Sequence, residues 1–322
     1  MMHHFPETPI QPVYTTAEGH NEIFVKRDDL LPFSYGGNKV RIARAFVEDM
    51  KAKGADSLIF YGDRRSNLCR VLAAICRIEG IPGLMIATEE HKTSEREPFN
   101  SALIRSCGVP ILDCDKSAIA ETVDKAFDML KAQGHKPYYI YGDRTGSGNE
   151  GTAARAYAAA YGEIASFEER EGQTFDLIVT PYGTGATYSG LIAGAMERGE
   201  ERTIVGISIS SRTYERAYGL LMDGIMDYFG DRSEVMRERI APMIHLETQY
   251  NKGGYGLYDD EVEAVIDRCL KAYSLPTDPT YTGKAFLGME QYLKDRGITN
   301  SRVLFLHTGG LPLHFDYLAE KE

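Results

Sequence analysis

The sequence predicts an α/β protein made of open, mostly parallel sheets with helices on both faces. Short β-branched or aromatic runs alternate along the chain with amphipathic stretches of 10–20 residues. Such βαβα alternation is typical of parallel sheets covered by helices. A chain of 322 residues with 43% apolar and 26% charged residues can bury a substantial core, as one large or two ordinary domains.

The predicted elements follow one another without a low-complexity linker. Strands are expected at residues 57–61, 83–88, 109–112, 137–141, 175–180, 203–209 and 303–306. Helices are expected at 40–50, 67–79, 118–132, 152–164, 186–196, 260–273 and 283–294. The Gly-rich stretch 142–151 is the best candidate for a crossover between domains. Ligands of such folds bind at the carboxyl ends of the strands, so the chemistry is expected in the loops that follow them.

Charge and composition exclude several classes of partner. A net charge of −11 and a pI near 5.3 argue against nucleic acid and anionic membranes. No apolar run approaches the roughly 20 residues of a membrane span, and the first residues lack signal-peptide anatomy. The five cysteines are scattered, and the eight histidines form no HxxxH pair. We therefore expect free thiols, a cytoplasmic protein and no metal site.

The stretch Gly36-Gly37-Asn38-Lys39 is the most informative in the chain. Two glycines allow positive φ and close backbone approach, and Lys39 opens an amphipathic run. A lysine at a helix N-terminus feels the positive end of the dipole, which favours its neutral, nucleophilic form. The alternative is a surface lysine at a helix start.

A second signal is the Gly/Thr loop at residues 180–190. It follows an apolar strand and opens a helix, so backbone N–H groups and hydroxyls together form an anion site. The loop has neither the GK[ST] of a P-loop nor a dinucleotide fingerprint, which favours a monophosphate. A side chain at Gly185 is expected to push into that phosphate. The alternative is a plain tight turn.

Two further segments end strands with hydroxyls and open backbone. Ser66-Asn67 follows one strand, although helix capping explains both residues equally well. Residues 278–284 are followed by a strand that ends in His307-Thr308-Gly309-Gly310. A nucleophilic lysine, a monophosphate cradle and hydroxyls at strand ends together suggest pyridoxal 5′-phosphate.

These motifs also carry a family resemblance. The chain resembles the fold type II pyridoxal-phosphate enzymes, which are similar to the tryptophan synthase β subunit, and within them the group containing 1-aminocyclopropane-1-carboxylate deaminase and D-cysteine desulfhydrase. The matching segments run in the family's order over nearly the whole chain: 26–30, 36–39, 66–67, 183–187, 255–257, 278–284 and 307–310. The resemblance implies two open sheet domains with the cofactor in the cleft between them. Their expected bounds are 1–45 with 156–322 for the larger domain and 46–155 for the smaller. Relatives of this kind are commonly homodimers, so a homodimer is expected.

The resemblance also implies the roles of individual residues. Lys39 becomes the Schiff-base lysine, Asn67 the contact to the pyridine 3′-oxygen, and Ser66 a residue close to the substrate carboxylate or Cα proton. Tyr255 and Tyr281 match the two active-site tyrosines, which orient the substrate carboxylate or protonate the leaving group. The phosphate would be held by the backbone or hydroxyls of Gly183, Thr184, Gly185, Ala186 and Thr187.

Two positions divide the group. The cyclopropane deaminases carry Glu beside the ring nitrogen and Leu before the late Gly-Gly pair, whereas this chain has Thr282 and Thr308. A hydroxyl leaves the nitrogen neutral, which suffices for α-proton loss and β-elimination. The resemblance thus implies α,β-elimination from a small β-substituted amino acid, as in D-cysteine desulfhydrase, giving a 2-oxo acid and ammonia. The alternatives are a β-replacement synthase, a 1-aminocyclopropane-1-carboxylate deaminase-like enzyme, and a phosphate-binding α/β protein without the cofactor.

The chain departs from the family pattern at three places. The loop before Ser66 is Tyr-Gly-Asp-Arg-Arg where the family has Gly-Gly-x-Gln, Ile42 replaces a frequent phosphate-binding lysine, and loop 143–151 differs. The tetrapeptide Tyr-Gly-Asp-Arg occurs at 61–64 and again at 141–144. The arginines of these two loops, Arg64, Arg65 and Arg144, predict a binding site for a second acidic group on the substrate. The alternative is an internal ion-pair network in which Asp63 and Asp143 neutralise these arginines.

Overall fold

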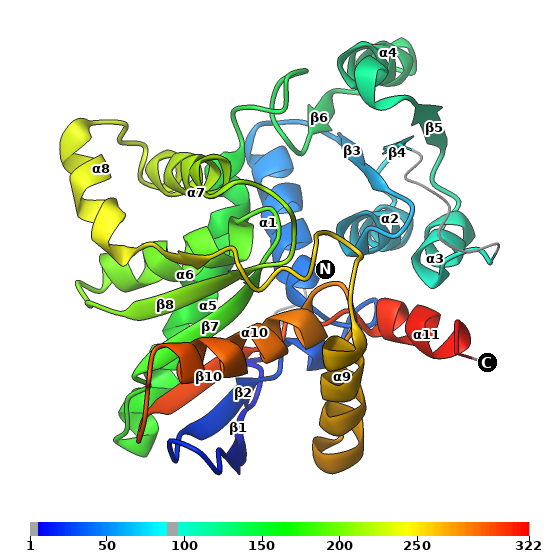
Figure 1. Cartoon of the computed structure of the whole chain (residues 1–322). Helices are drawn as coiled ribbons and strands as arrows, with labels where there is room; N and C mark the ends of the chain where they lie inside the picture. Colours follow the sequence, from blue (N-terminus) through cyan, green and yellow to red (C-terminus); the bar gives the residue numbers. More distant parts are fainter. Residues whose placement is uncertain (1–5, 89–95, 322) are drawn as a thin grey trace.

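A computed structural model describes residues 6–88 and 96–321 and contains two separate sheets (Figure 1). The first has six strands in the order β1-β2-β10-β7-β8-β9, and the second has four in the order β5-β4-β3-β6. All neighbouring strands are parallel except β1 and β2. The predicted fold class is therefore confirmed.

The strands of the two sheets come from different parts of the chain. The six-stranded sheet contains β1 (Ile10–Thr15), β2 (Glu22–Lys26), β7 (Leu177–Tyr182), β8 (Thr203–Ser208), β9 (His245–Glu247) and β10 (Arg302–Leu306). The four-stranded sheet contains β3 (Ser57–Asp63), β4 (Gly83–Thr88), β5 (Ile111–Cys114) and β6 (Pro137–Tyr139). The whole second sheet thus lies between residues 57 and 139, inside the segment 46–155 for which a smaller domain is predicted. The exact domain bounds stay a prediction.

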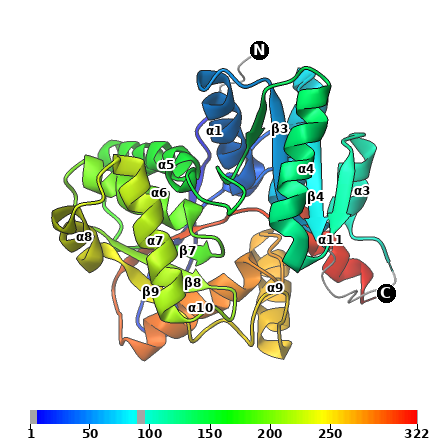
Figure 2. The same ribbon diagram turned by 90° about the horizontal axis from the view of Figure 1, so that it is seen from above.

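Helices cover both faces of each sheet (Figures 1 and 2). On the outer face of the six-stranded sheet lie α9 (Asp260–Tyr273) and α10 (Thr282–Asp295), and α4 (Ile119–Ala132) covers one face of the other sheet. The remaining α-helices are α1 (Asn38–Ala52), α2 (Asn67–Glu79), α3 (Phe99–Ser106), α5 (Glu150–Glu171), α6 (Ala186–Glu197), α7 (Tyr214–Phe229), α8 (Glu234–Ile240) and α11 (Leu311–Ala319). Short 3-10 turns lie at Asp28–Leu30, Lys116–Ala118 and Ala241–Met243.

One continuous core joins the two sheets. In β3, Leu58 and Phe60 face this shared core, whereas Ile59 between them faces α4 on the other side. In β10, Leu304 faces the shared core and Phe305 faces the cluster under α9 and α10. Alternate residues of a strand point to opposite faces, so a strand buried on both sides must be apolar throughout. This explains why these strands appear as unbroken hydrophobic runs in the sequence.

The structure differs from the predicted elements mainly at strands and helices with weak signals. Strands β1, β2 and β9 and helices α3, α7, α8 and α11 were not expected. The strand predicted at 137–141 ends at Tyr139, and the one predicted at 109–112 is shifted to Ile111–Cys114. Strand β9 has three residues and α8 has seven, so neither repeats a periodic pattern often enough to be recognised. Helices α2 and α9 have the predicted bounds, because Ser66 and Asp259 cap them with side-chain hydrogen bonds.

Candidate active site

The start of α1 is held against the carboxyl end of β10. Gly37 has φ 95°, and a Cβ on it would lie 2.8 Å from the carbonyl oxygen of Thr308. The next backbone N–H, that of Asn38, donates to the same oxygen at 3.0 Å. Only glycine permits this approach, so the Gly-Gly pair brings Lys39, the second residue of α1, to the ligand-binding edge of the six-stranded sheet.

Lys39 has the electrostatics of a nucleophile. Desolvation lowers the pKa of Lys39 to about 8, far below the usual value for a lysine. At pH 7 about a tenth of the amine is therefore uncharged, far more than for an ordinary lysine, and nucleophilic attack requires this form. The cause is desolvation of the amine, a different effect from the helix dipole that the sequence suggests.

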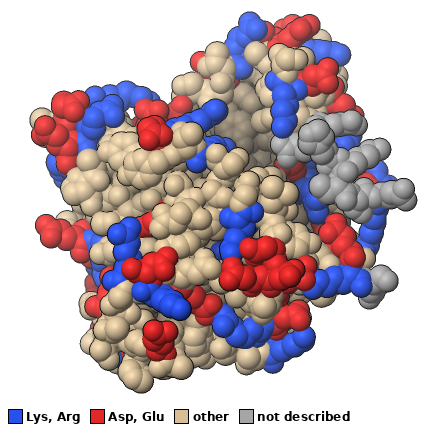
Figure 3. Space-filling view, in the orientation of Figure 1, with Lys and Arg blue, Asp and Glu red and all other residues tan. Residues whose placement is uncertain are grey.

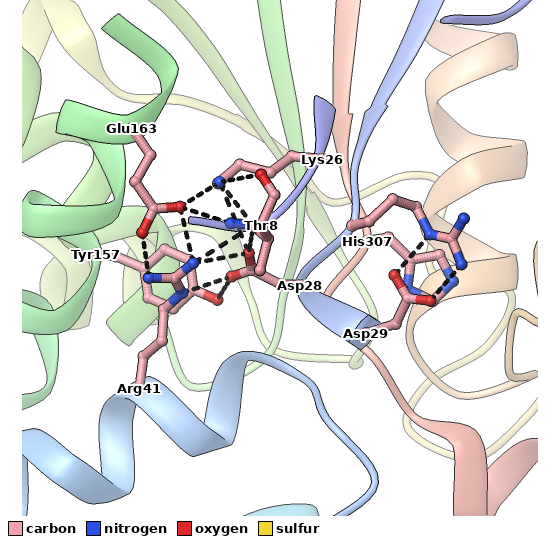
Figure 4. Close-up of polar contacts among 9 residues, drawn as sticks. Thr8, Lys26, Asp28, Asp29, Arg41, Tyr157, Glu163 and His307 are labelled. Carbon is pink, nitrogen blue, oxygen red and sulfur yellow. Dashed lines mark hydrogen bonds and ion pairs between the residues drawn. The ribbon is translucent and has the colours of Figure 1, made fainter. Parts of the chain in front are cut away.

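A buried polar cluster anchors the first turn of α1 through Arg41 (Figure 4). The Arg41 guanidinium lies between the carboxylates of Asp28 and Glu163, with Nε donating to Asp28 at 3.0 Å and Nη1 donating to Glu163 at 2.6 Å. The other members are Lys26, Thr8 and Tyr157. Two cations face two carboxylates, so the cluster is balanced in charge. The carbonyl of Asp28 also accepts the Gly37 N–H at 2.8 Å, which ties the cluster to the glycine loop.

A neighbouring group in Figure 4 orients the end of β10. Arg27 pairs with Asp29 at 2.7 Å, and Nδ1 of His307 lies 3.6 Å from the same carboxylate. Nδ1 of His307 also accepts the Gly309 N–H at 3.2 Å, and Nε2 lies 3.0 Å from the carbonyl oxygen of Pro276. Nε2 is thus placed to donate to Pro276, and Nδ1 accepts from Gly309. His307 therefore braces the turn that carries Thr308 and Gly309.

The Gly/Thr loop lies beside Lys39. It ends at Gly185, the N-cap of α6, and Thr184 is exposed at its tip. The Asn38 side chain donates to the Thr187 hydroxyl at 2.9 Å, which joins the first turns of α1 and α6. Arg212 donates to the Gly183 carbonyl at 2.5 Å. This arrangement of N–H groups, hydroxyls and a nearby cation fits a phosphate.

The structure gives a different reason for the glycine at position 185 from the expected clash with a phosphate. Gly185 has φ 99°, and a Cβ there would meet the Tyr182 ring at 3.2 Å and Leu221 at 3.4 Å. The glycine is therefore already required by its backbone conformation and by the packed core behind the loop. A bulky substitution would distort the loop whether or not a phosphate binds, so it does not test the phosphate site.

The two predicted tyrosines meet next to this loop. Their hydroxyls are 3.1 Å apart, and the rings of Tyr255 and Tyr281 lie edge to face with centroids 5.8 Å apart. A Cβ on Gly183 would be 3.5 Å from the Tyr281 ring. Burial raises the pKa of Tyr281 well above its usual value, and Tyr255, Asp63 and Asp278 raise it further. Tyr281 thus keeps its proton, and either of the two hydroxyls can donate in their contact.

Thr282 and Thr308 take different positions in the site. Thr282 is fully buried at the start of α10, and its hydroxyl lies 2.8 Å from Oδ2 of Asp278. Its oxygen is also 3.5 Å from the Gly309 carbonyl. Thr308 is nearly buried on the turn that supports Gly37. Through these contacts the six-stranded sheet brings Lys39, Thr187, Gly183, Tyr281 and Thr282 together.

Ser66 and Asn67 occupy the facing edge of the four-stranded sheet. The Ser66 hydroxyl accepts the Cys69 N–H at 3.2 Å and caps α2, as the simpler interpretation proposed. The Asn67 oxygen accepts from Asn100 at 3.0 Å, and Asn100 also donates to the Arg65 carbonyl at 2.7 Å. Because its oxygen is engaged, Asn67 can offer its NH2 group to a ligand. The assigned role of both residues toward cofactor and substrate stays a prediction.

The predicted arginines lie in exposed ion pairs with partners outside their own loops. Arg64 pairs with Asp113 at 2.6 Å, Arg65 with Glu320 at 3.7 Å, and Arg144 with Asp124 at 2.9 Å. The three arginines thus form ion pairs, as the alternative expected, and the carboxylates of these pairs are Asp113, Glu320 and Asp124. Asp63 also accepts the Arg65 N–H, and Asp143 accepts the N–H groups of Thr145 and Ser147. Substrate binding by the arginines stays a prediction.

Several residues of the site were given no role from the sequence. Asn38 touches Thr187, and Asp278 holds the turn before α10 by accepting from Thr280, Tyr281 and Thr282. An Asp before Pro, two residues from a threonine, is a turn signature that could have identified Asp278. Arg212 and Lys284 come close to the site because of the tertiary fold, which no local pattern indicates. Lys284 is fully buried and donates to the Gly254 carbonyl at 2.6 Å.

The surface is hollowed where the two sheets face one another. Figure 3 shows a hollow between the side that carries α7 and the side that carries α4 and β6, with Lys and Arg side chains at its rim. Over residues 6–88 and 96–321, no helix is long and apolar enough to cross a membrane. The same residues contain no group of three or more His, Cys, Asp or Glu side chains placed to hold a metal ion. The five cysteines are unpaired.

Comparison with known proteins decides the family. The model of the pyridoxal-phosphate dependent enzymes matches residues 1–309. The chain belongs to this family. A Pyrococcus abyssi protein, provisionally named 1-aminocyclopropane-1-carboxylate deaminase, is 32% identical over 317 residues, covering 97% of this chain and 91% of that protein. The 1-aminocyclopropane-1-carboxylate deaminase of Burkholderia ambifaria is 28% identical over 324 residues, covering 96% and 93%.

Solved structures agree with this assignment. The crystal structure of a 1-aminocyclopropane-1-carboxylate deaminase homologue matches with a TM-score of 0.80 and 28% identity, over 98% of this chain and 92% of that one. A hydrogen sulfide-producing enzyme from Fusobacterium nucleatum shares the fold, with a TM-score of 0.65 and 17% identity over 94% and 93% of the chains. The resemblance stated from the motifs is confirmed, and the cofactor is pyridoxal 5′-phosphate. The residues fit this group, since a lysine amine with a lowered pKa lies beside an N–H- and hydroxyl-lined helix start.

Proposed function

We propose that this enzyme deaminates a small β-substituted amino acid by α,β-elimination and releases a 2-oxo acid and ammonia. The observation that carries the proposal is the position of Lys39. Its amine has a pKa lowered to about 8. Lys39 belongs to the first turn of α1, which is joined to the Gly/Thr loop by the hydrogen bond from Asn38 to Thr187. A lysine placed so can hold the cofactor and, once released by the substrate amine, accept the Cα proton.

The other residues bind and orient. The loop at residues 183–187 would hold the phosphate, Asn67 would donate to the ring 3′-oxygen, and Thr282 and Thr308 would lie along the nitrogen side of the ring. Ser66 would contact the substrate carboxylate. Pyridoxal phosphate supplies an electron sink for the pair released when the Cα proton leaves. Tyr281, which keeps its proton, would donate to the leaving group with Tyr255 as its hydrogen-bond partner.

A second candidate function is opening of 1-aminocyclopropane-1-carboxylate. Two observations favour it: the names of the relatives, and the Asp278 carboxylate that lies directly behind Thr282. Thr282 and Thr308, in place of Glu and Leu, favour β-elimination. An amino-acid panel separates the two. We expect pyruvate and ammonia from D-cysteine or β-chloro-alanine and little 2-oxobutanoate from the cyclopropane substrate. Efficient ring opening without β-elimination would overturn the first proposal in favour of the second.

The expected homodimer and cytoplasmic location belong to the same proposal. Both rest on the resemblance and on ordinary soluble composition. Light scattering of the purified holoenzyme is the test for the dimer, and a monomer at micromolar concentration would contradict it.

A further inference from the structure

Helix α11 joins the part of the chain around the six-stranded sheet to the part around the four-stranded sheet. It follows β10 and lies beside α3, the helix between β4 and β5 (Figures 1 and 2). One side of α11 is anchored on the six-stranded sheet. Nδ1 of His314 lies 2.8 Å from the Thr277 carbonyl oxygen, and Tyr317 belongs to the core under α9 and α10. The residues between them, Phe315 and Asp316, contact α3 instead.

Asp316 supplies the helix cap that α3 lacks. The N-cap residue of α3 is Pro98, whose side chain makes no capping hydrogen bond. The first N–H of the helix, that of Phe99, donates at 2.9 Å to Oδ1 of Asp316, which lies 217 positions further along the chain. The rings of Phe99 and Phe315 also lie edge to face, with centroids 6.1 Å apart. The first N–H groups of a helix have no partner inside it, so an acceptor at this place stabilises the first turn of α3.

This contact needs only an oxygen acceptor. The Asp316 side chain is buried, and its Oδ2 has no hydrogen-bond partner among the described residues. Burial raises the pKa of Asp316 above its usual value, whereas the Phe99 N–H, Arg65 and Arg96 lower it. A protonated carboxyl group with its hydrogen on Oδ2 still accepts at Oδ1. The hydrogen bond to Phe99 is therefore available in both protonation states.

The first turn of α3 in turn holds the loop that carries Ser66 and Asn67. Asn100, the second residue of α3, is fully buried. Its amide nitrogen donates to the Arg65 carbonyl at 2.7 Å and to the Asn67 side-chain oxygen at 3.0 Å. An amide NH2 group has two hydrogens, so both are used in fixing this loop. A second connection runs from the Arg65 side chain to Glu320 at the end of α11, at 3.7 Å.

We propose that Asp316 is a positioning residue, through which α11 on the six-stranded sheet fixes the Ser66-Asn67 loop on the facing edge of the four-stranded sheet. The inference rests on the proposed roles of Ser66 and Asn67. Lys39 lies on one edge and these two residues on the other, so a substrate that contacts both requires a fixed distance between the edges. The path from Asp316 through the start of α3 to Asn100 provides this connection, and no part of it belongs to the site itself.

The test is hydrogen–deuterium exchange of the cofactor-free protein, followed by mass spectrometry on the peptide that covers residues 63–70. Asp316→Leu keeps the side-chain size but removes the acceptor, so exchange in this peptide should become at least about fivefold faster. Asp316→Asn keeps an oxygen acceptor and should exchange like the wild type. Ser233→Ala is the matched control, because it removes the cap of the distant α8 and should leave residues 63–70 unchanged.

A second variant interrupts the same path at its other end. Asn100→Ala should speed exchange of residues 63–70 by a similar factor and leave that of α11 unchanged. Combined with Asp316→Leu, it should add little, because residues on one path do not contribute independently. Unchanged exchange of residues 63–70 in either single variant, or equal effects of Asp316→Leu and Asp316→Asn, would overturn the proposal.

Turnover supplies a separate measurement. In the holoenzyme, Asp316→Leu should raise the KM for the amino acid about fivefold or more and leave kcat nearly unchanged, because Lys39 lies on the other edge. A loss of kcat at unchanged KM would contradict the positioning role. The exchange experiment uses neither cofactor nor substrate, so it decides the inference independently of the reaction. Failure to release ammonia from any amino acid would contradict the proposed function alone.

Discussion

The carboxyl edges of the two sheets face each other, yet they are built differently. On the six-stranded sheet, the residues around Lys39 touch through backbone contacts that only glycine permits and rest on a buried cluster of balanced charges. On the four-stranded sheet, the equivalent loops carry Arg64, Arg65 and Arg144 in exposed pairs. The first edge is closely packed over a buried cluster, whereas the ion pairs of the second edge are largely open to solvent.

This difference separates two tasks. A cofactor shared by all substrates needs fixed positions, which close packing and buried hydrogen bonds provide. Recognition of one particular substrate can rest on solvated side chains that change without loss of the fold. We therefore expect substitutions at the first edge to affect stability and all turnover, and substitutions at the second to affect selectivity.

The largest effect is expected at Lys39. Lys39→Ala should fold but lose the visible cofactor band and reduce turnover by at least about 10²–10⁴-fold, the contribution of a positioned base. Absorbance and ammonia release measure both. Retained turnover would show that Lys39 is not catalytic. The two edges would then not differ in the tasks proposed for them.

The buried cluster should dominate stability. Arg41→Met leaves the Asp28 and Glu163 carboxylates without their shared cation, and should lower the free energy of unfolding by about 3–5 kcal/mol. Arg64→Met is the matched control, because it breaks an exposed pair whose loss should cost less than about 1 kcal/mol. Urea unfolding of both variants gives the comparison. Equal losses of unfolding free energy would show that the two edges do not differ in their contribution to stability.

Arg65 should influence selectivity more than stability. If Arg65 binds an acidic group on the substrate, Arg65→Met should lower kcat/KM for acidic substrates by the equivalent of about 1.5–3 kcal/mol. The kcat/KM for neutral substrates should stay nearly unchanged. Parallel losses for both kinds of substrate would mean that Arg65 only holds its loop to Glu320 at the end of α11.

The smallest effect concerns the cofactor-free protein. Desolvation lowers the folded-state pKa of Lys39 to about 8, so below that pH the buried ammonium destabilises the native state. Between about pH 8 and the unfolded pKa near 10.5 the native amine loses its proton while the unfolded one keeps it, so this penalty fades as pH rises. Lys39→Met should therefore stabilise the cofactor-free protein by about 1–2 kcal/mol at pH 7 and by less at pH 9.5. A gain that does not change with pH would contradict the lowered pKa.

The sequence could predict what depends on local patterns. The glycine loops, the capped starts of α2 and α9 and the apolar strands all carry signals within a few residues. It could not predict that Glu163 joins Asp28 and Arg41 in one cluster, because Glu163 lies more than 100 residues further along the chain. Nor could it show that Gly185 is constrained by Tyr182 and Leu221, or that Arg64 finds Asp113, since tertiary packing decides such partners.

The central claim is that Lys39, at the closely packed edge, carries the cofactor. Reduction of the purified holoenzyme with borohydride should bleach its yellow colour and fix the cofactor to one lysine, which peptide mass mapping then identifies. The account predicts the added mass on the peptide that contains Lys39 and on no other. The added mass on Lys284 or Lys26, two fully buried lysines, would contradict it.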